Sequence, residues 1–105
     1  MASVELNGEV MKDAAGFHAE CQRAFGFPGF YAGTMDAWVD SLSYLRDDEN
    51  MTKFRLKPTE LLEIVVKASS EVQPDLLEEM TYCVAGINER YDDYGEKAAL
   101  KLTLR

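Results

Sequence analysis

Three segments of the chain have apolar patterns that predict β-strands. Leu61 to Val66 is almost continuously apolar and rich in β-branched residues, which is typical of a strand covered on both faces. Val4 to Asn7 is a shorter segment, and the Asn7-Gly8 dipeptide after it favours a turn. Residues 100–105, LKLTLR, alternate between apolar and polar, which predicts a strand exposed on one face. We expect the segment 61–66 to be the central strand.

Apolar spacings of three and four residues predict a first helix after the first strand. Asp13 can cap its start, and Gly26 can adopt the positive φ that often ends a helix. The apolar positions are Phe17, Cys21, Ala24 and Phe25, with Glu20, Gln22 and Arg23 expected to point outward. His18 lies next to the apolar stripe, and because the chain has one histidine we interpret it as structural.

A second helix is predicted from Met35 onward, with Thr34 as its N-cap. At about 100° per residue, one side is apolar and consists of Met35, Trp38, Val39, Leu42 and Leu45. The other side carries Asp36, Asp40, Ser43 and Tyr44. The loop before the helix is aromatic and partly rigid, with Phe27, Pro28, Phe30 and Tyr31. Together the loop and the outer side of this helix have the character of a binding face.

The third predicted helix starts with Pro74 in its first turn and is apolar at Leu77, Met80, Val84, Ile87 and Tyr91. Three connections complete the chain. Residues 46–50 are charged, and the alternation at 51–56 permits a short edge strand or merely an extended segment before Pro58. Residues 69–73 are expected to be a polar linker and 92–97 a charged turn.

This order of elements predicts one α/β domain over residues 1–105. Strands separated by helices favour right-handed crossovers, and so a parallel sheet of three strands packed with three or more helices. The chain has no apolar run of about 18 residues and no signal-peptide pattern at its start. Cys21 and Cys83 fall at apolar positions of separate helices, which favours reduced thiols. We therefore expect a cytoplasmic protein.

The formal net charge of −8, from 19 acidic and 11 basic residues, repels nucleic acid and anionic membranes and attracts cationic proteins. The sequence contains no P-loop, GxGxxG, CxxC or HExxH motif, and a lone histidine offers no acid/base pair. We therefore expect no enzyme activity, metal or cofactor.

Asp36 and Asp40 stay open to two interpretations on the local pattern alone. The helix dipole favours an aspartate in a first turn, and Asp40 can be one member of a solvated face. Alternatively, the two carboxylates, about 40° apart around the helix, bind a positively charged partner. Neighbours on one convex face do not flank a substrate from opposite walls, so glycosidase chemistry is disfavoured.

Four stretches of the chain form a recognisable pattern: VELNG at 4–8, Phe17-His18, FGFPGFYAG at 25–33 and MDAWVDSL at 35–42. Together they resemble the barstar family of inhibitors of barnase-type ribonucleases, and the similarity runs without a gap from about Glu5 to Leu42. The rest of the chain resembles the family only in its order of elements. The resemblance implies a compact domain with a three-stranded parallel sheet. Its acidic helix and aromatic loop would block the active site of a cationic ribonuclease, with carboxylates where RNA phosphates bind.

Residue by residue, the resemblance implies a set of partner contacts. Asp40 matches the family's dominant aspartate, Asp36 the aspartate one turn earlier, and Phe30 and Tyr31 the aromatic pair of the loop. Around them we expect Ala32, Gly33, Thr34, Val39, Ser43 and Tyr44, and late in the third helix Glu89. The resemblance implies a basic ribonuclease or ribonuclease toxin as the partner, and we expect no nucleic acid, membrane or small-molecule cofactor.

The chain departs from the family pattern near this face. Phe30 lacks a phenolic hydroxyl, and Ala32 and Thr34 replace a glycine and an asparagine. Val39 stands where the family has tryptophan, and Trp38 comes one place earlier. These changes leave the inhibitory role intact but affect which ribonuclease is the target, and that target need not be barnase. Two alternatives remain open: an acidic ligand-binding domain or enzyme that uses Phe30, Tyr31, Asp36 and Asp40 as a pocket, and a scaffold for another basic protein.

Overall fold

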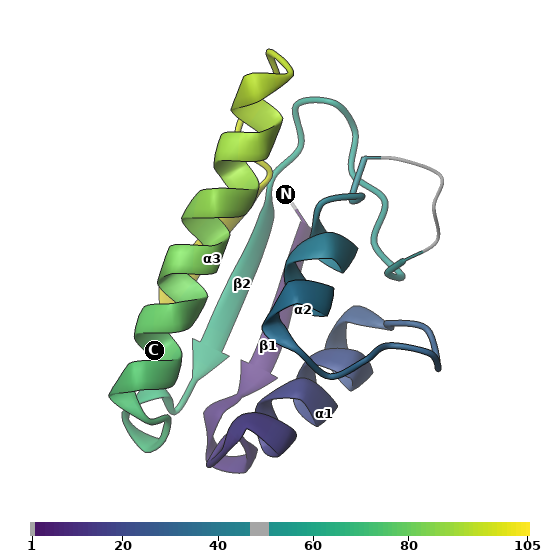
Figure 1. Cartoon of the computed structure of the whole chain (residues 1–105). Helices are drawn as coiled ribbons and strands as arrows, with labels where there is room; N and C mark the ends of the chain where they lie inside the picture. Colours follow the sequence, from purple (N-terminus) through teal and green to yellow (C-terminus); the bar gives the residue numbers. More distant parts are fainter. Residues whose placement is uncertain (1, 47–50) are drawn as a thin grey trace.

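A parallel sheet with the strand order β1-β2-β3 runs through the molecule (Figure 1). The computed structural model describes residues 2–46 and 51–105. The strands are β1 (Ala2–Asn7), β2 (Leu62–Lys67) and β3 (Leu100–Leu104), and the helices are α1 (Ala14–Phe25), α2 (Met35–Leu42) and α3 (Pro74–Asp93). Two short 3-10 turns, η1 (Gly8–Val10) and η2 (Ser69–Glu71), follow β1 and β2. The predicted α/β fold and the central position of the second strand are confirmed.

All three helices lie on one side of the sheet (Figure 1). The strand register places Val4, Ile64 and Leu102 side by side, and this row faces the helices and the core. Strand β2 was expected to be covered on both faces. That expectation is wrong, because the adjacent row of Glu5, Val65 and Thr103 faces away from the helices. Val65, in that row, is nevertheless only 4% exposed.

Side chains of the neighbouring strands explain the burial of Val65. Glu5 and Lys67 form an ion pair of 2.9 Å, and Thr103 donates to Glu63 Oε2 at 2.6 Å. By register, Glu5 and Thr103 lie on either side of Val65. The continuous apolar run of β2 is therefore compatible with a sheet that has helices on one face only.

The predicted helix ends are confirmed. Asp13 accepts from the Gly16 N–H at 2.7 Å, and Thr34 accepts from the Ala37 N–H at 3.1 Å. Gly26, with φ of 70°, donates its N–H to the Gln22 carbonyl at the end of α1. Pro74 lies in the first turn of α3. The last turn of α3 reaches Asp93, so the charged turn is shorter than expected.

Two connections differ from their predictions, and in a third the edge-strand alternative is not realised. Asn7 does not form a simple turn with Gly8, because its side chain accepts from the Glu9 N–H at 3.0 Å and caps η1. Residues 69–73 contain η2 and the buried Val72, so this linker is not purely polar. Residues 51–56 form no strand. Instead the Leu56 N–H donates to the Leu45 carbonyl at 2.7 Å, which ties an irregular segment to the end of α2. Residues 47–50 of the charged connection lie outside the described residues.

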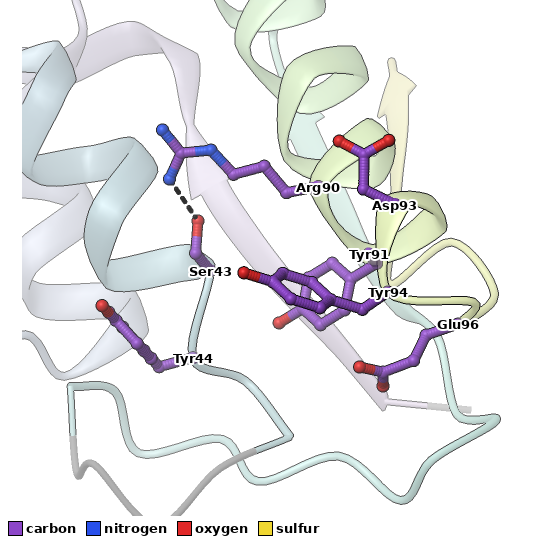
Figure 2. A pocket seen from close by; sticks show the side chains of 7 residues that line it. All are labelled: Ser43, Tyr44, Arg90, Tyr91, Asp93, Tyr94 and Glu96. Atoms are coloured by element: carbon purple, nitrogen blue, oxygen red, sulfur yellow. Dashed lines mark hydrogen bonds between the residues drawn. The ribbon is translucent and has the colours of Figure 1, made fainter.

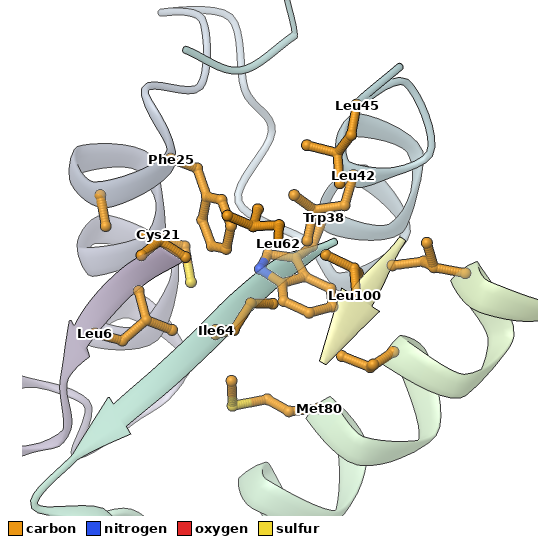
Figure 3. Packing of buried hydrophobic residues seen from close by; sticks show 14 of the residues in the cluster. Leu6, Cys21, Phe25, Trp38, Leu42, Leu45, Leu62, Ile64, Met80 and Leu100 are labelled. Carbon is orange, nitrogen blue, oxygen red and sulfur yellow. The ribbon is translucent and has the colours of Figure 1, made fainter. Parts of the chain in front are cut away.

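The core fills the space between the sheet and the helices (Figure 3). Trp38 is fully buried there and makes an edge contact with Phe25 at 6.4 Å between ring centroids. Cys21 is also fully buried, and burial raises the pKa of its thiol to about 12. Cys21 and Cys83 are both free cysteines on separate helices, as predicted.

Glu20 was expected to point outward but is 6% exposed. Its Oε2 accepts from the Asn7 N–H at 2.7 Å, and Arg23 donates to both carboxylate oxygens at 2.8 Å. The hydrogen bond from Arg23 lowers the pKa of Glu20, against the opposing effect of burial. Helix α1 packs against the end of β1 at this point, so the Glu20 carboxylate accepts a hydrogen bond from the last backbone N–H of the strand.

Candidate functional site

The exposed side of α2 carries Asp36 and Asp40, and we call these two residues and the Ser43 and Tyr44 that follow them the acidic face. Thr34 fixes where the helix begins, and so fixes which positions turn inward. Trp38 and Leu42 are fully buried, whereas both aspartates are exposed. The predicted division of this helix into two sides is confirmed, except that Met35 and Val39 are only half-buried.

The loop before α2 holds its two aromatic residues differently. Phe30 is 77% exposed, and the loop around it consists of the exposed Ala32, Gly33 and Thr34. Tyr31 is half-buried, with its ring centroid 4.5 Å from that of Phe27. The predicted aromatic pair therefore separates into one residue that points into solvent and one that packs on the core.

A hydrogen bond anchors Tyr31 to α1. The Tyr31 hydroxyl lies 2.6 Å from His18 Nδ1. Burial lowers the pKa of His18, with a smaller opposite effect from the Glu79 charge, and burial also raises the pKa of Tyr31. Both groups are therefore neutral near pH 7. His18 has the structural role expected of it, and that role is to hold the loop of the acidic face.

Arg90 of α3 is part of this site, although the sequence analysis did not select it. Its Nη1 lies 3.6 Å from Asp40 Oδ1 and donates to Ser43 Oγ at 3.2 Å. Ser43 in turn donates to the Val39 carbonyl at 2.7 Å. Arg90 comes one residue before the buried Tyr91, so the sequence could place it at the edge of the buried stripe. No sequence signal shows that α2 lies along that edge.

Glu89, the residue of α3 expected at the site, is exposed one position before Arg90. One residue corresponds to about 100° around a helix, so the two side chains leave α3 in different directions. Within residues 2–46 and 51–105, no described contact joins Glu89 to the acidic face. The structure brings Arg90, and not Glu89, to Asp40.

An open pocket of about 560 Å³ lies between the ends of α2 and α3 (Figure 2). Its lining residues are Ser43, Tyr44, Arg90, Tyr91, Asp93, Tyr94 and Glu96. Tyr91 is fixed at the base, where its hydroxyl accepts from the Leu45 N–H at 3.1 Å and the Arg46 guanidinium lies 5.0 Å from its ring centroid. Phe30, Tyr31, Asp36 and Asp40 do not line this pocket. The pocket shares Ser43 and Tyr44 with the acidic face, but it is not the pocket that the ligand-binding alternative requires.

The chemistry of the acidic face is that of charge recognition. Exposed carboxylates on a rigid helix can accept forked, charge-assisted hydrogen bonds from a guanidinium group. Among the described residues, no group of three or more histidine, cysteine, aspartate or glutamate side chains is arranged to hold a metal ion. None of the helices in that part of the chain is both long and apolar enough to cross a membrane.

Comparison with known protein families identifies the family of this chain. The model of the family described as Barstar (barnase inhibitor) matches residues 1–103, which is nearly the whole chain. The match thus extends well beyond the segment 5–42 that carries the sequence resemblance, and it includes α3 and all but the last residue of β3. No curated protein matches the chain.

Proposed function

Because the chain belongs to the barstar family, we propose that it is a stoichiometric inhibitor of a cationic ribonuclease, acting as a cytoplasmic immunity protein or antitoxin. The observation that supports this function best is the acidic face, where Asp36 and Asp40 are exposed on a helix whose opposite side buries Trp38 and Leu42. A convex acidic surface of this kind can enter a cleft that normally binds RNA phosphates.

Asp40 is the centre of the proposed interface. It lies between Asp36 and Ser43 along α2, so a partner can exclude water around it on all sides, and energetically dominant residues occupy such centres. The surrounding contacts are Phe30, Tyr31, Ala32, Gly33, Thr34, Asp36, Val39, Ser43, Tyr44 and Glu89. The rule that overall charge speeds encounter while a central charge pair slows dissociation is itself drawn from the barnase–barstar pair.

A ribonuclease inhibition assay tests the function, with barnase as the first enzyme and other cationic ribonucleases after it. We expect loss of RNA cleavage at one inhibitor per enzyme, and no turnover by the chain itself. Asp40→Asn should weaken inhibition by about a hundredfold or more, mainly through faster dissociation, because it leaves cations of the partner buried without a counter-charge. Asp36→Asn should have a smaller effect.

Glu5→Gln is the matched control, since it changes the net charge by the same amount as Asp40→Asn. Glu5 is exposed on the face of the sheet that no helix covers, so its loss should leave inhibition nearly unchanged. Equal effects of the two variants would show that only net charge matters. Catalysis by the purified chain would refute the proposal.

A further inference from the structure

Arg90 places a positive charge inside the surface that we assign to a cationic partner. Its guanidinium contacts both Asp40 and Ser43, at 3.6 and 3.2 Å. Figure 2 shows its side chain reaching from α3 across to the end of α2. A partner that covers Asp40 therefore covers Arg90 as well.

The pair of Asp40 and Arg90 is open to solvent in the free chain. The two side chains are 67% and 53% exposed, and ion pairs of this kind are weak. Binding changes the situation, because a guanidinium that is shielded from water needs a counter-charge and acceptors for its five N–H groups. Asp40 cannot supply them fully once its carboxylate also binds a cation of the partner.

The chain itself offers little replacement for Asp40. The two carboxylates that line the pocket beside Arg90 belong to Asp93 and Glu96. Glu96 pairs with Arg46 at 3.4 Å. Asp93 lies three residues further along α3, and Figure 2 shows Arg90 extending away from it. The partner is therefore the best source of the missing counter-charge.

We propose that Arg90 is a specificity-determining residue and that the ribonuclease carries a carboxylate opposite it, next to the cation that binds Asp40. This inference rests on the proposed function. On binding, Asp40 pairs with the partner's cation and Arg90 with the partner's carboxylate, so that one internal pair is replaced by two pairs across the interface. A ribonuclease whose contact surface is uniformly basic binds more weakly, because Arg90 repels it.

Such neighbouring charges are chemically reasonable in an active site that cleaves RNA. Cations hold the phosphates, and a carboxylate can act as the general base. An inhibitor that carries both signs of charge can therefore satisfy the whole site, whereas an inhibitor with carboxylates alone leaves a carboxylate of the enzyme opposed by like charge. The sign and position of Arg90 thus define which ribonucleases fit.

The test measures association and dissociation rates of Arg90→Gln and Arg90→Lys with barnase and with each further ribonuclease that the wild-type chain inhibits. We expect Arg90→Gln to raise the dissociation rate about tenfold or more. Arg90→Lys should recover part of this loss, because it keeps the charge but not the forked geometry. A double-mutant cycle of Arg90→Gln with amide variants of the enzyme's active-site carboxylates should show coupling to one of them.

Several results would overturn the inference and leave the proposed function intact. One is an Arg90→Gln variant that dissociates as slowly as wild type, or more slowly. Another is a loss that couples to no carboxylate of the enzyme. A third is an Asp93→Asn variant that is as impaired as Arg90→Gln, with no further loss in the double variant, because Arg90 would then transfer to Asp93 within the chain. Thermal midpoints of all variants establish that they are folded.

A different pair of results counts against the proposed function itself. If Asp40→Asn inhibits as well as wild type, the acidic face is not the contact surface. If the wild-type chain inhibits none of the ribonucleases tested, the proposed function and the role of Arg90 are both refuted.

Discussion

Tyr31→Phe tests whether the aromatic loop is anchored to α1 through a single hydrogen bond. The Tyr31 hydroxyl lies 2.6 Å from Nδ1 of His18, which is itself buried. Phenylalanine keeps the ring that packs against Phe27 and removes only the hydroxyl. The imidazole nitrogen then loses its partner in a place that water does not readily reach.

The expected loss of stability follows from that orphaned nitrogen. A hydrogen bond between neutral groups contributes about 0.5–1.5 kcal/mol net, and a buried polar atom left without a partner costs about 1–3 kcal/mol. We therefore expect the free energy of unfolding to fall by about 1–3 kcal/mol in Tyr31→Phe. For a domain of this size, each kcal/mol lowers the thermal midpoint by roughly 4–8 °C.

Thermal unfolding followed by circular dichroism measures this effect, with Tyr94→Phe as the matched control. Tyr94 is 84% exposed, so loss of its hydroxyl should change stability by no more than about 0.5 kcal/mol. Phe30→Ala provides the complementary case: it should leave the midpoint unchanged and speed dissociation from the ribonuclease. If Tyr31→Phe melted at the same temperature as Tyr94→Phe, the hydrogen bond to His18 would not be what anchors the loop.

Three further predictions concern salt, pH and backbone packing. Raising the ionic strength should slow association with the ribonuclease much more than it speeds dissociation, because exposed charges are screened beyond about 10 Å at roughly 0.1 M salt; a salt-independent association rate would contradict charge steering. Burial lowers the pKa of His18, so the folded protein should have its full stability above the ordinary histidine pKa of 6.5 and lose stability as pH falls below that value. His18→Gln should abolish this loss when thermal midpoints are compared between pH 7 and pH 5. The Glu20 carboxylate does not interfere, because its pKa is lowered, so its stabilising contribution is lost only as pH falls below its ordinary value of 4.5. Gly8→Ala should destabilise the fold by about 3 kcal/mol in denaturant unfolding, because its Cβ would lie 2.5 Å from the Ala68 carbonyl oxygen, whereas Gly86→Ala, with nothing within 4 Å, should not destabilise it.

Local patterns were sufficient to predict most of the fold. The N-caps Asp13 and Thr34 and the end of α1 at Gly26 depend on residues within one turn, so sequence alone specifies them. The third helix and the last strand were likewise predicted from apolar spacing. What spacing could not show was how many faces of β2 are covered, because Val65 is shielded by residues of the two neighbouring strands and not by a helix.

The candidate site was predictable on α2 and much less so elsewhere. The exposure of Asp36 and Asp40 follows from the phase of one helix. By contrast, the contact of Arg90 with Asp40 joins residues that are far apart in the chain, and it depends on how α2 and α3 pack. Glu20 was misplaced for the same reason, since its burial depends on the contact of α1 with β1. Charged residues at the edges of buried stripes are therefore where sequence reasoning fails first.

The position of all three helices on one side of the sheet has a consequence for how such an inhibitor can evolve. On the uncovered side, Glu5 and Lys67 form an ion pair with each other, and both side chains are exposed to solvent. Their replacement can alter the charge and solubility of the molecule without altering the surface that the partner contacts. Conversely, a few changes along α2 and at Arg90 can redirect recognition while the core stays as it is. Selection on partner choice and selection on the fold therefore act on largely separate sets of residues.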